Sequence, residues 1–314
     1  MTNTTKNTLL LALLGLSFSS GCGPEFDPAS RIERTRVLGA RIEVEGAPDR
    51  ATPKPGETAH ITWLVAAPDT TPPLGWTFVL CAPGTAMGSA GCLDMPAARF
   101  DGTATPPRVS IPVPSSAGLG GPASVVMYGE ICAGAGSMPA FDPQTGLATC
   151  TAGGRGTTVS LVFPLQLGDE ANHNPVADRA FTLDGVAWPA PSGAAPCAAE
   201  GPRVTAGSRA HVIAGTTDGS DRERYTALVG DPPTPVPARE QLQISQFTTA
   251  GELKSQFSFV EATDEGATTT VQVGWDAPEA AEVPAGGLAV TFTFVVRDER
   301  GGADWTTRSL CVTP

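Results

Sequence analysis

The chain has 314 residues, a formal net charge of −12 and 41% apolar residues, together with 36 glycines and 30 prolines. The acidic charge repels phosphate backbones and argues against a nucleic-acid binder. The content of Gly and Pro is rich in turns but stays below the level typical of disorder, and the length suits two domains of ordinary size.

The first 21 residues have the pattern of a secretory signal. Lys6 precedes an apolar run from Leu9 to Leu16, which is about half the ~20 residues that a membrane-spanning helix needs. Small residues and a cysteine follow, Ser19 to Cys22. This segment resembles the lipobox of bacterial lipoproteins, although Ser19 stands where that family usually has Leu.

The lipobox resemblance implies that Cys22 is acylated with fatty acids such as palmitate and that residues 1–21 are removed. Gly23, where retention in the inner membrane often uses Asp, favours the outer membrane or cell surface. The alternative is an ordinary signal that leaves Cys22 as a free thiol. The count of seven cysteines opposes it, because lipid on Cys22 leaves six that can all pair.

After a tether over 22–35, residues 36–167 predict a first β-sandwich. Apolar residues alternate with polar or small ones, which is the strand pattern, and clusters of Gly and Pro separate the runs. About seven short strands are expected, which is typical of a sandwich. Their apolar positions include 38–44, 59–65, 76–80, 109–113, 125–131 and 159–165.

A polar, turn-rich linker is predicted over 168–175, and a second β-sandwich over 176–314. Its expected strands begin with Phe181 and Leu183, which lead through a turn at Asp184–Gly185 to Val186, and continue at 204–214, 225–229, 242–247, 257–260, 269–275, 290–296 and 305–312. Asp298–Gly302 is predicted to be a hairpin turn. A shared segment, PGETAHI at 55–61 and AGSRAHV at 206–212, indicates two copies of one all-β, immunoglobulin-like architecture.

At the level of family, the lipobox followed by RVLGARIEVEG and KPGETAHITW resembles surface lipoproteins of GC-rich bacteria with tandem immunoglobulin-like domains. The second half, from NHNPVA to VTFTFVVRDERGGADW, is similar to cadherin-like or PKD-like repeats. The resemblance implies placement at the cell surface and little about activity. No Trp lies between Cys81 and Cys150, so the antibody-type pattern is absent.

Six cysteines allow 15 pairings. Division by domain leaves Cys197 and Cys311 to pair in the second half. In the first half we favour Cys81–Cys92 and Cys132–Cys150, because each pair of sequence neighbours brackets a Gly-rich loop. Structural bridges are favoured over metal or thiol chemistry, since no C-x-x-C motif occurs and the expected compartment is oxidising.

No catalytic or phosphate-binding motif is found, so the sequence predicts a non-enzymatic protein. His60 and His211 are predicted to face solvent, and their spacing suggests neither a metal site nor a catalytic triad. No cofactor is expected apart from calcium, for which Asp169, Glu170, Asn172 and Asn174 at the linker are weak candidates. Solvated polar loops remain the favoured interpretation of these residues.

The expected function is that of a lipid-anchored envelope protein acting as a structural or protein-binding surface module. Its partners would be the membrane, through the lipid, and an envelope protein or glycan. The loops 82–91 and 133–149, each bracketed by cysteines, are the expected contact surface. The alternatives are a calcium-stiffened spacer and a glycan-binding module that uses Trp188, Trp275 and Trp305, for which core packing is the favoured interpretation.

Overall fold

The computed structural model describes residues 28–81, 92, 96–115, 124–142, 148–153, 156–166, 169–191, 197 and 201–314. Within these ranges the chain is built from β-strands with short 3-10 turns. None of the described residues form a helix of the length and apolarity needed to cross a bilayer. The predicted signal segment and Cys22 lie outside the described residues.

The first sandwich packs a three-stranded sheet, β1-β2-β5, against a four-stranded sheet, β4-β3-β6-β9. The strands are β1 (Arg36–Val44), β2 (Thr58–Ala66), β3 (Leu74–Cys81), β4 (Pro96–Gly102), β5 (Arg108–Pro112), β6 (Ser124–Ala133) and β9 (Thr157–Pro164). The short pair β7 (Pro139–Phe141) and β8 (Ala148–Cys150) lies beside them. The core is apolar, and Trp63 stacks on Phe78 with ring centroids 3.9 Å apart.

The second sandwich packs the sheet β11-β10-β13-β19-β17 against the sheet β12-β21-β20-β16-β18. The strands of the first are β10 (Phe181–Leu183), β11 (Val186–Ala187), β13 (His211–Asp218), β17 (Glu252–Leu253) and β19 (Thr268–Asp276). Those of the second are β12 (Arg203–Thr205), β16 (Leu242–Thr248), β18 (Phe257–Val260), β20 (Leu288–Arg297) and β21 (Ala303–Thr313). Two strands remain outside both sheets, β14 (Arg224–Val229) and β15 (Thr234–Arg239).

Seven strands of each sandwich are connected in the same order. In the first, β1-β2-β5 faces β4-β3-β6-β9, and in the second β10-β13-β19 faces β18-β16-β20-β21. Every pairing within these sets is antiparallel. This is the seven-stranded, two-sheet arrangement of immunoglobulin-like domains, so the predicted fold class is confirmed. The shared PGETAHI and AGSRAHV segments enter the equivalent strands β2 and β13.

The strands differ from the sequence prediction in several places. The run at 204–214 was expected to be one strand, but it is two, β12 and β13, separated by a turn at Gly207 with φ of +70°. Strands β4, β7, β8, β15 and β17 were not predicted. Strand β15 was missed because it contains Pro235 and Pro237. Proline has no backbone N–H to donate to a neighbouring strand, so its presence argued against a strand in the sequence.

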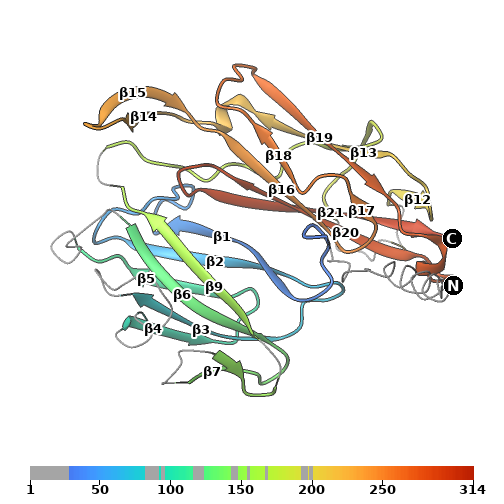
Figure 1. Ribbon diagram of the computed structural model, residues 1–314, viewed down its shortest axis with the longest axis horizontal. Helices are drawn as coiled ribbons and strands as arrows, with labels where there is room; N and C mark the ends of the chain where they lie inside the picture. The colour runs from blue at the N-terminus through green and yellow to red at the C-terminus, as the bar shows by residue number, and fades with distance from the viewer. Residues whose placement is uncertain are drawn as a thin grey trace, which may run out of the picture.

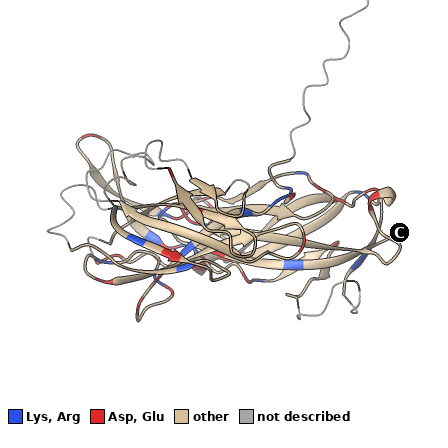
Figure 2. Cartoon of the chain, turned by 90° about the horizontal axis from the view of Figure 1, so that it is seen from below, with Lys and Arg blue, Asp and Glu red and all other residues tan. Residues whose placement is uncertain are grey.

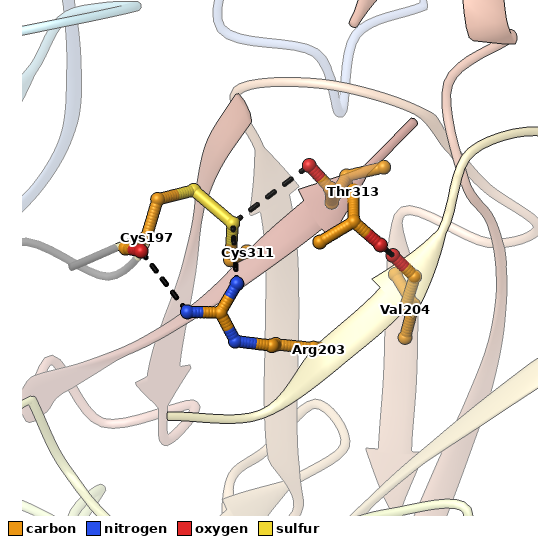
Figure 3. Close-up of a disulfide and its surroundings, with 6 residues drawn as sticks. Cys197, Arg203, Val204, Cys311 and Thr313 are labelled. Carbon is orange, nitrogen blue, oxygen red and sulfur yellow. Dashed lines mark hydrogen bonds between the residues drawn. A yellow bond between two sulfur atoms is a disulfide. The ribbon is translucent and has the colours of Figure 1, made fainter. Parts of the chain in front are cut away.

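The three predicted disulfides are present. Cys81–Cys92 and Cys132–Cys150 close short loops of the first sandwich, and Cys197–Cys311 joins the segment before β12 to the last strand. Figure 3 shows Arg203 beside this third bridge, with its guanidinium donating to the Cys197 carbonyl at 3.0 Å. Chain-entropy arithmetic gives this bridge, which spans 114 residues, a stabilisation of roughly 5 kcal/mol.

The two sandwiches lie side by side rather than end to end, with β1 against β21 (Figure 1). An apolar cluster fills the contact and draws on three parts of the chain. Leu38 comes from β1, Phe247 and Val295 come from the second sandwich, and Ile32 comes from the segment before β1. Arg297 reaches across from β20 and donates to the Leu38 carbonyl.

The segment before β1 also binds the second sandwich through its backbone. The Ile32 N–H donates to the Thr248 carbonyl at 2.8 Å, and the Thr248 N–H donates to the Ser30 carbonyl at 2.9 Å. Residues 30–32 therefore belong to the folded unit, although the sequence interpretation assigned 22–35 to a tether.

The predicted linker is held between both sandwiches by two buried asparagines. The Nδ2 of Asn174 donates to the Ile42 carbonyl at 2.7 Å, and its Oδ1 accepts the Ala303 N–H at 3.0 Å. The backbone N–H of Asn172 donates to Thr52, and its side chain donates to Asp298 on the opposite side. Each of these two residues therefore bridges the sandwiches, Asn174 through its side chain and Asn172 through its backbone and side chain together.

Asn174→Ala is expected to lower the free energy of unfolding by about 2–4 kcal/mol, because it leaves the Ala303 N–H and the Ile42 carbonyl without this partner at a buried site. Scanning calorimetry should show the unfolding transition lowered and broadened as the sandwiches uncouple. Val176→Ala, at a nearby exposed position, is the control. An unchanged transition in the Asn174 variant would show that the amide does not couple the sandwiches.

Candidate functional site

A two-stranded hairpin, β14–β15, projects from the second sandwich and is called the arm here (Figure 1). It is inserted between β13 and β16, where the first sandwich passes directly from β2 to β3. Its outer half exposes apolar side chains, with Leu228 70%, Val229 55% and Val236 37% accessible. Exposed apolar groups gathered on one projection are typical of a protein contact.

The arm is also protected against strand addition along one edge. Pro235 and Pro237 alternate along β15, and proline within a ladder is confined to edges whose N–H positions face solvent. On β14, the Thr226 N–H donates to the Glu170 carboxylate at 3.1 Å. These features favour contact through the side chains of the arm over pairing of its backbone.

A buried polar network holds the base of the arm. Glu223 precedes β14 and Glu240 follows β15, and both carboxylates accept hydrogen bonds from Arg300, at 3.2 and 3.0 Å. Arg300 also donates to the Ala171 carbonyl in the linker, and its guanidinium lies 4.6 Å from the centroid of the Tyr225 ring. One cation therefore joins the arm to the linker.

Carboxylates outnumber cations in this network. Glu240 is 1% exposed. Burial, together with the nearby charges of Asp298 and Glu223, raises its pKa to about 7. Burial also raises the pKa of Asp298, whose Oδ1 accepts the N–H groups of Arg300 and Gly302. The base of the arm therefore takes up protons near neutral pH.

The four calcium candidates at the linker have separate partners. Asn172 and Asn174 are buried in the contact between the sandwiches, Glu170 accepts two hydrogen bonds from Thr226, and Asp169 is exposed. Across the described ranges, no group of three or more His, Cys, Asp and Glu side chains is placed to hold a metal ion.

His211 does not simply face solvent as predicted. Its side chain is 15% exposed. Its Nδ1 lies 2.7 Å from the Asp184 carboxylate and its Nε2 lies 2.7 Å from the Ser208 hydroxyl. The sequence did not indicate this because Asp184 belongs to the turn after β10, and only pairing of β10 with β13 brings it to His211. His60 pairs with Ser110 at 2.7 Å.

The three tryptophans considered for glycan binding do not form a stacking surface. Trp188 and Trp275 are buried in the second core on either side of Phe292, with ring centroids 5.2 and 5.1 Å from it. Trp305 packs against the apolar cluster between the sandwiches. The expectation that these side chains serve as core is confirmed for Trp188 and Trp275.

Of the loops expected as a contact surface, 82–91 lies outside the described residues. The described part of 133–149 forms the β7–β8 pair, which is joined to β6 by the Cys132–Cys150 bridge. A groove of about 440 Å³ runs between the β9 edge and the turn after β20. Figure 2 shows Lys and Arg interspersed with Asp and Glu along the chain.

Glu240→Gln is expected to weaken the pH dependence of stability. The ordinary pKa of this carboxyl is 4.5 and the folded value is about 7. The folded state therefore binds more protons between these values, and the free energy of unfolding of the parent falls as pH rises across that window. The variant should gain up to roughly 3 kcal/mol relative to the parent over the same window.

Urea unfolding at pH 4.5, 6 and 8 provides the measurement, with Glu261→Gln at an exposed position as the control. Parallel pH profiles for the parent and the Glu240 variant would contradict the assignment.

The chain matches no family model and no curated protein. Among solved structures, the crystal structure of the FN1–FN3 domains of chicken CNTN1 is similar to it at 9% identity, covering 91% of this chain and 68% of that one, with a TM-score of 0.20. A likeness at that score carries no argument, and the strand order of the chain itself defines the fold.

Proposed function

We propose that this protein is a lipid-anchored, two-domain module of the bacterial envelope that binds another envelope protein through the arm. The observation that carries the proposal is the exposure of Leu228, Val229 and Val236 on a hairpin held at its base by Arg300. An isolated two-stranded hairpin is marginally stable in water. The buried network at its base therefore serves to present the outer half in a fixed orientation.

The contact between the sandwiches supports the same proposal. Buried asparagines, an apolar cluster and the segment at 30–32 fix one sandwich against the other. A rigid body presents a contact surface at a low entropic cost of binding. This rigidity is supplied by protein contacts, so the spacer alternative needs no calcium in the linker. The glycan-binding alternative is less favoured, because two of its three candidate side chains, Trp188 and Trp275, are buried.

The arm variant Leu228→Asp/Val236→Asp is expected to lose envelope partners that the parent captures. Each introduced aspartate would have to lose its hydration when the partner binds. Loss of one interface hot spot typically lowers the binding free energy by more than about 2 kcal/mol, or some 30-fold in affinity. Capture from envelope extracts by the full-length protein, read by quantitative mass spectrometry, is the measurement.

Val186→Asp is the matched control, because Val186 is also 70% exposed but lies on β11. Equal capture by the parent, the arm variant and the control would reject the arm as the contact surface. Removal of 133–149 in a separate variant tests the loop closed by Cys132–Cys150.

Lipid attachment is tested by the intact mass of the protein purified from membranes. The expected result is a chain that begins at an acylated Cys22 and gains six hydrogens on reduction, two for each of three bridges. An unlipidated chain with a free thiol would mean a secreted protein. Cys22→Ser should move the protein into the soluble fraction.

A further inference from the structure

Three side chains of the second sandwich form a hydrogen-bonded series: Asp184 from the turn after β10, Ser208 from the turn before β13, and His211 at the start of β13. The Oδ2 of Asp184 lies 2.7 Å from His211 Nδ1, and His211 Nε2 lies 2.7 Å from the Ser208 hydroxyl oxygen. A carboxylate that orients an imidazole, which in turn contacts a hydroxyl, is the arrangement that activates a serine on unrelated folds. We propose that Ser208 is a nucleophilic serine that attacks esters, with His211 as its base and Asp184 as the positioning residue.

Asp184 is fixed for this role by its own turn. Its Oδ1 accepts the Val212 N–H at 2.8 Å, which leaves Oδ2 directed at the imidazole. Partial burial opposes ionisation, but hydrogen bonds from His211 and Val212 outweigh it and hold the pKa of Asp184 below its usual range. The carboxylate is therefore charged at neutral pH and favours the tautomer with the proton on Nδ1.

Backbone strain is concentrated at the same place. Within the described residues, the two non-glycine positions with positive φ are Asp184, at +52°, and Ala210, at +62°. Ala210 lies between Ser208 and His211, and its N–H donates to Asp276 at 2.8 Å. Asp184 adopts this conformation in the two-residue turn Asp184–Gly185 between β10 and β11, where Asp is well tolerated, whereas at Ala210 it is uncommon. Here they set the positions of the carboxylate and the serine relative to the ring.

The serine proton has two acceptors within reach. In the structure, Ser208 Oγ lies within hydrogen-bond distance of both the Thr205 carbonyl and His211 Nε2, and its one hydrogen can be donated to either of them but not to both. With the Nδ1 proton on the Asp184 side, Nε2 presents a lone pair to the same oxygen. Rotation of the hydroxyl hydrogen by its single torsion transfers the hydrogen bond from Thr205 to His211.

In the reaction, Ser208 Oγ forms a bond to the carbonyl carbon of the ester while its proton moves to His211 Nε2. The carbon–oxygen bond to the alcohol then breaks, and the alcohol leaves with that proton. Water next attacks the acyl-serine, gives its proton to His211 and releases a carboxylic acid, and the hydroxyl is restored. The ester and one water molecule are the only reactants consumed, and no change of oxidation state occurs.

The surroundings of the site restrict the class of substrate. Asp184 is 46% exposed and Ser208 is half-buried, so the site opens to solvent. Arg209, which follows Ser208 directly, has a 62% exposed guanidinium beside Asp276 and Glu279. An open site with one exposed, ion-paired cation suits small esters or ester groups borne on an exposed polymer, and turnover should be slow because the described residues build no rigid oxyanion hole beside Ser208.

The first sandwich provides an internal control. His60 occupies β2, the strand equivalent to β13, and its Nδ1 lies 2.7 Å from Ser110 Oγ on β5. Among the described residues, no carboxylate contacts the ring of His60. Ser110 is therefore a serine with an imidazole but without the positioning residue, in the same molecule.

The experiment treats the full chain with an alkyl fluorophosphonate at pH 7.5 and follows the adduct by intact mass and peptide mapping. Labelling is expected at Ser208, with loss in Ser208→Ala and a decrease on the order of 100-fold in Asp184→Asn and His211→Gln. Release of nitrophenol from p-nitrophenyl butyrate should follow the same order. Melting temperatures establish that each variant is folded.

The absence of an adduct, equal labelling of Ser110 and Ser208, or an undiminished rate in a folded Asp184→Asn would each overturn the proposal. Ser110→Ala should leave labelling unchanged. This chemistry is separate from the contact through the arm, so failure of either proposal leaves the other standing.

Discussion

The structure depends on the buried contact that joins the two sandwiches. Immunoglobulin-like domains in tandem move relative to one another unless their interface is large and apolar. Here Leu38, Phe247 and Val295 exclude water from that interface, and Asn174 satisfies backbone groups on both sides of it. The segment at Ile32 adds a third surface to the same cluster. This contact therefore sets the orientation of the second sandwich and of its arm relative to the first sandwich.

In the arm, a polar network at the base holds the exposed apolar side chains of the outer half in position. Arg300 lies in the turn after β20, which is part of the interface, and it binds carboxylates at both ends of the arm. A buried group such as Glu240 with a pKa near neutral makes this connection sensitive to protons. The outer half lies beyond this network and has exposed apolar side chains on both strands, with Asp231 in the turn between them, so the base and the outer half of the arm have separate physical roles.

The two copies of the fold have been elaborated differently. The first sandwich has two short-range bridges, whose cysteines include Cys81 at the end of β3, Cys132 in β6 and Cys150 at the end of β8. The second places its bridge across most of its length and inserts the arm between two core strands. It also surrounds the equivalent histidine with a carboxylate and a hydroxyl, whereas His60 in the first has the hydroxyl alone. The two sandwiches therefore share a topology and differ in the polar side chains that surround the equivalent histidine.

The sequence alone determined the all-β class, the repeated architecture, most strands and the three disulfide pairs, because alternation of side chains and cysteine spacing are local signals. It did not predict β15, whose prolines interrupt the pattern, or the division of 204–214 at Gly207. Only the tertiary structure decided that Asn172 and Asn174 join the sandwiches instead of forming a polar loop. It alone brought Asp184 to His211, since these residues lie 27 positions apart and meet through strand pairing. Contacts of that kind depend on register and packing across the whole fold, which no local pattern encodes.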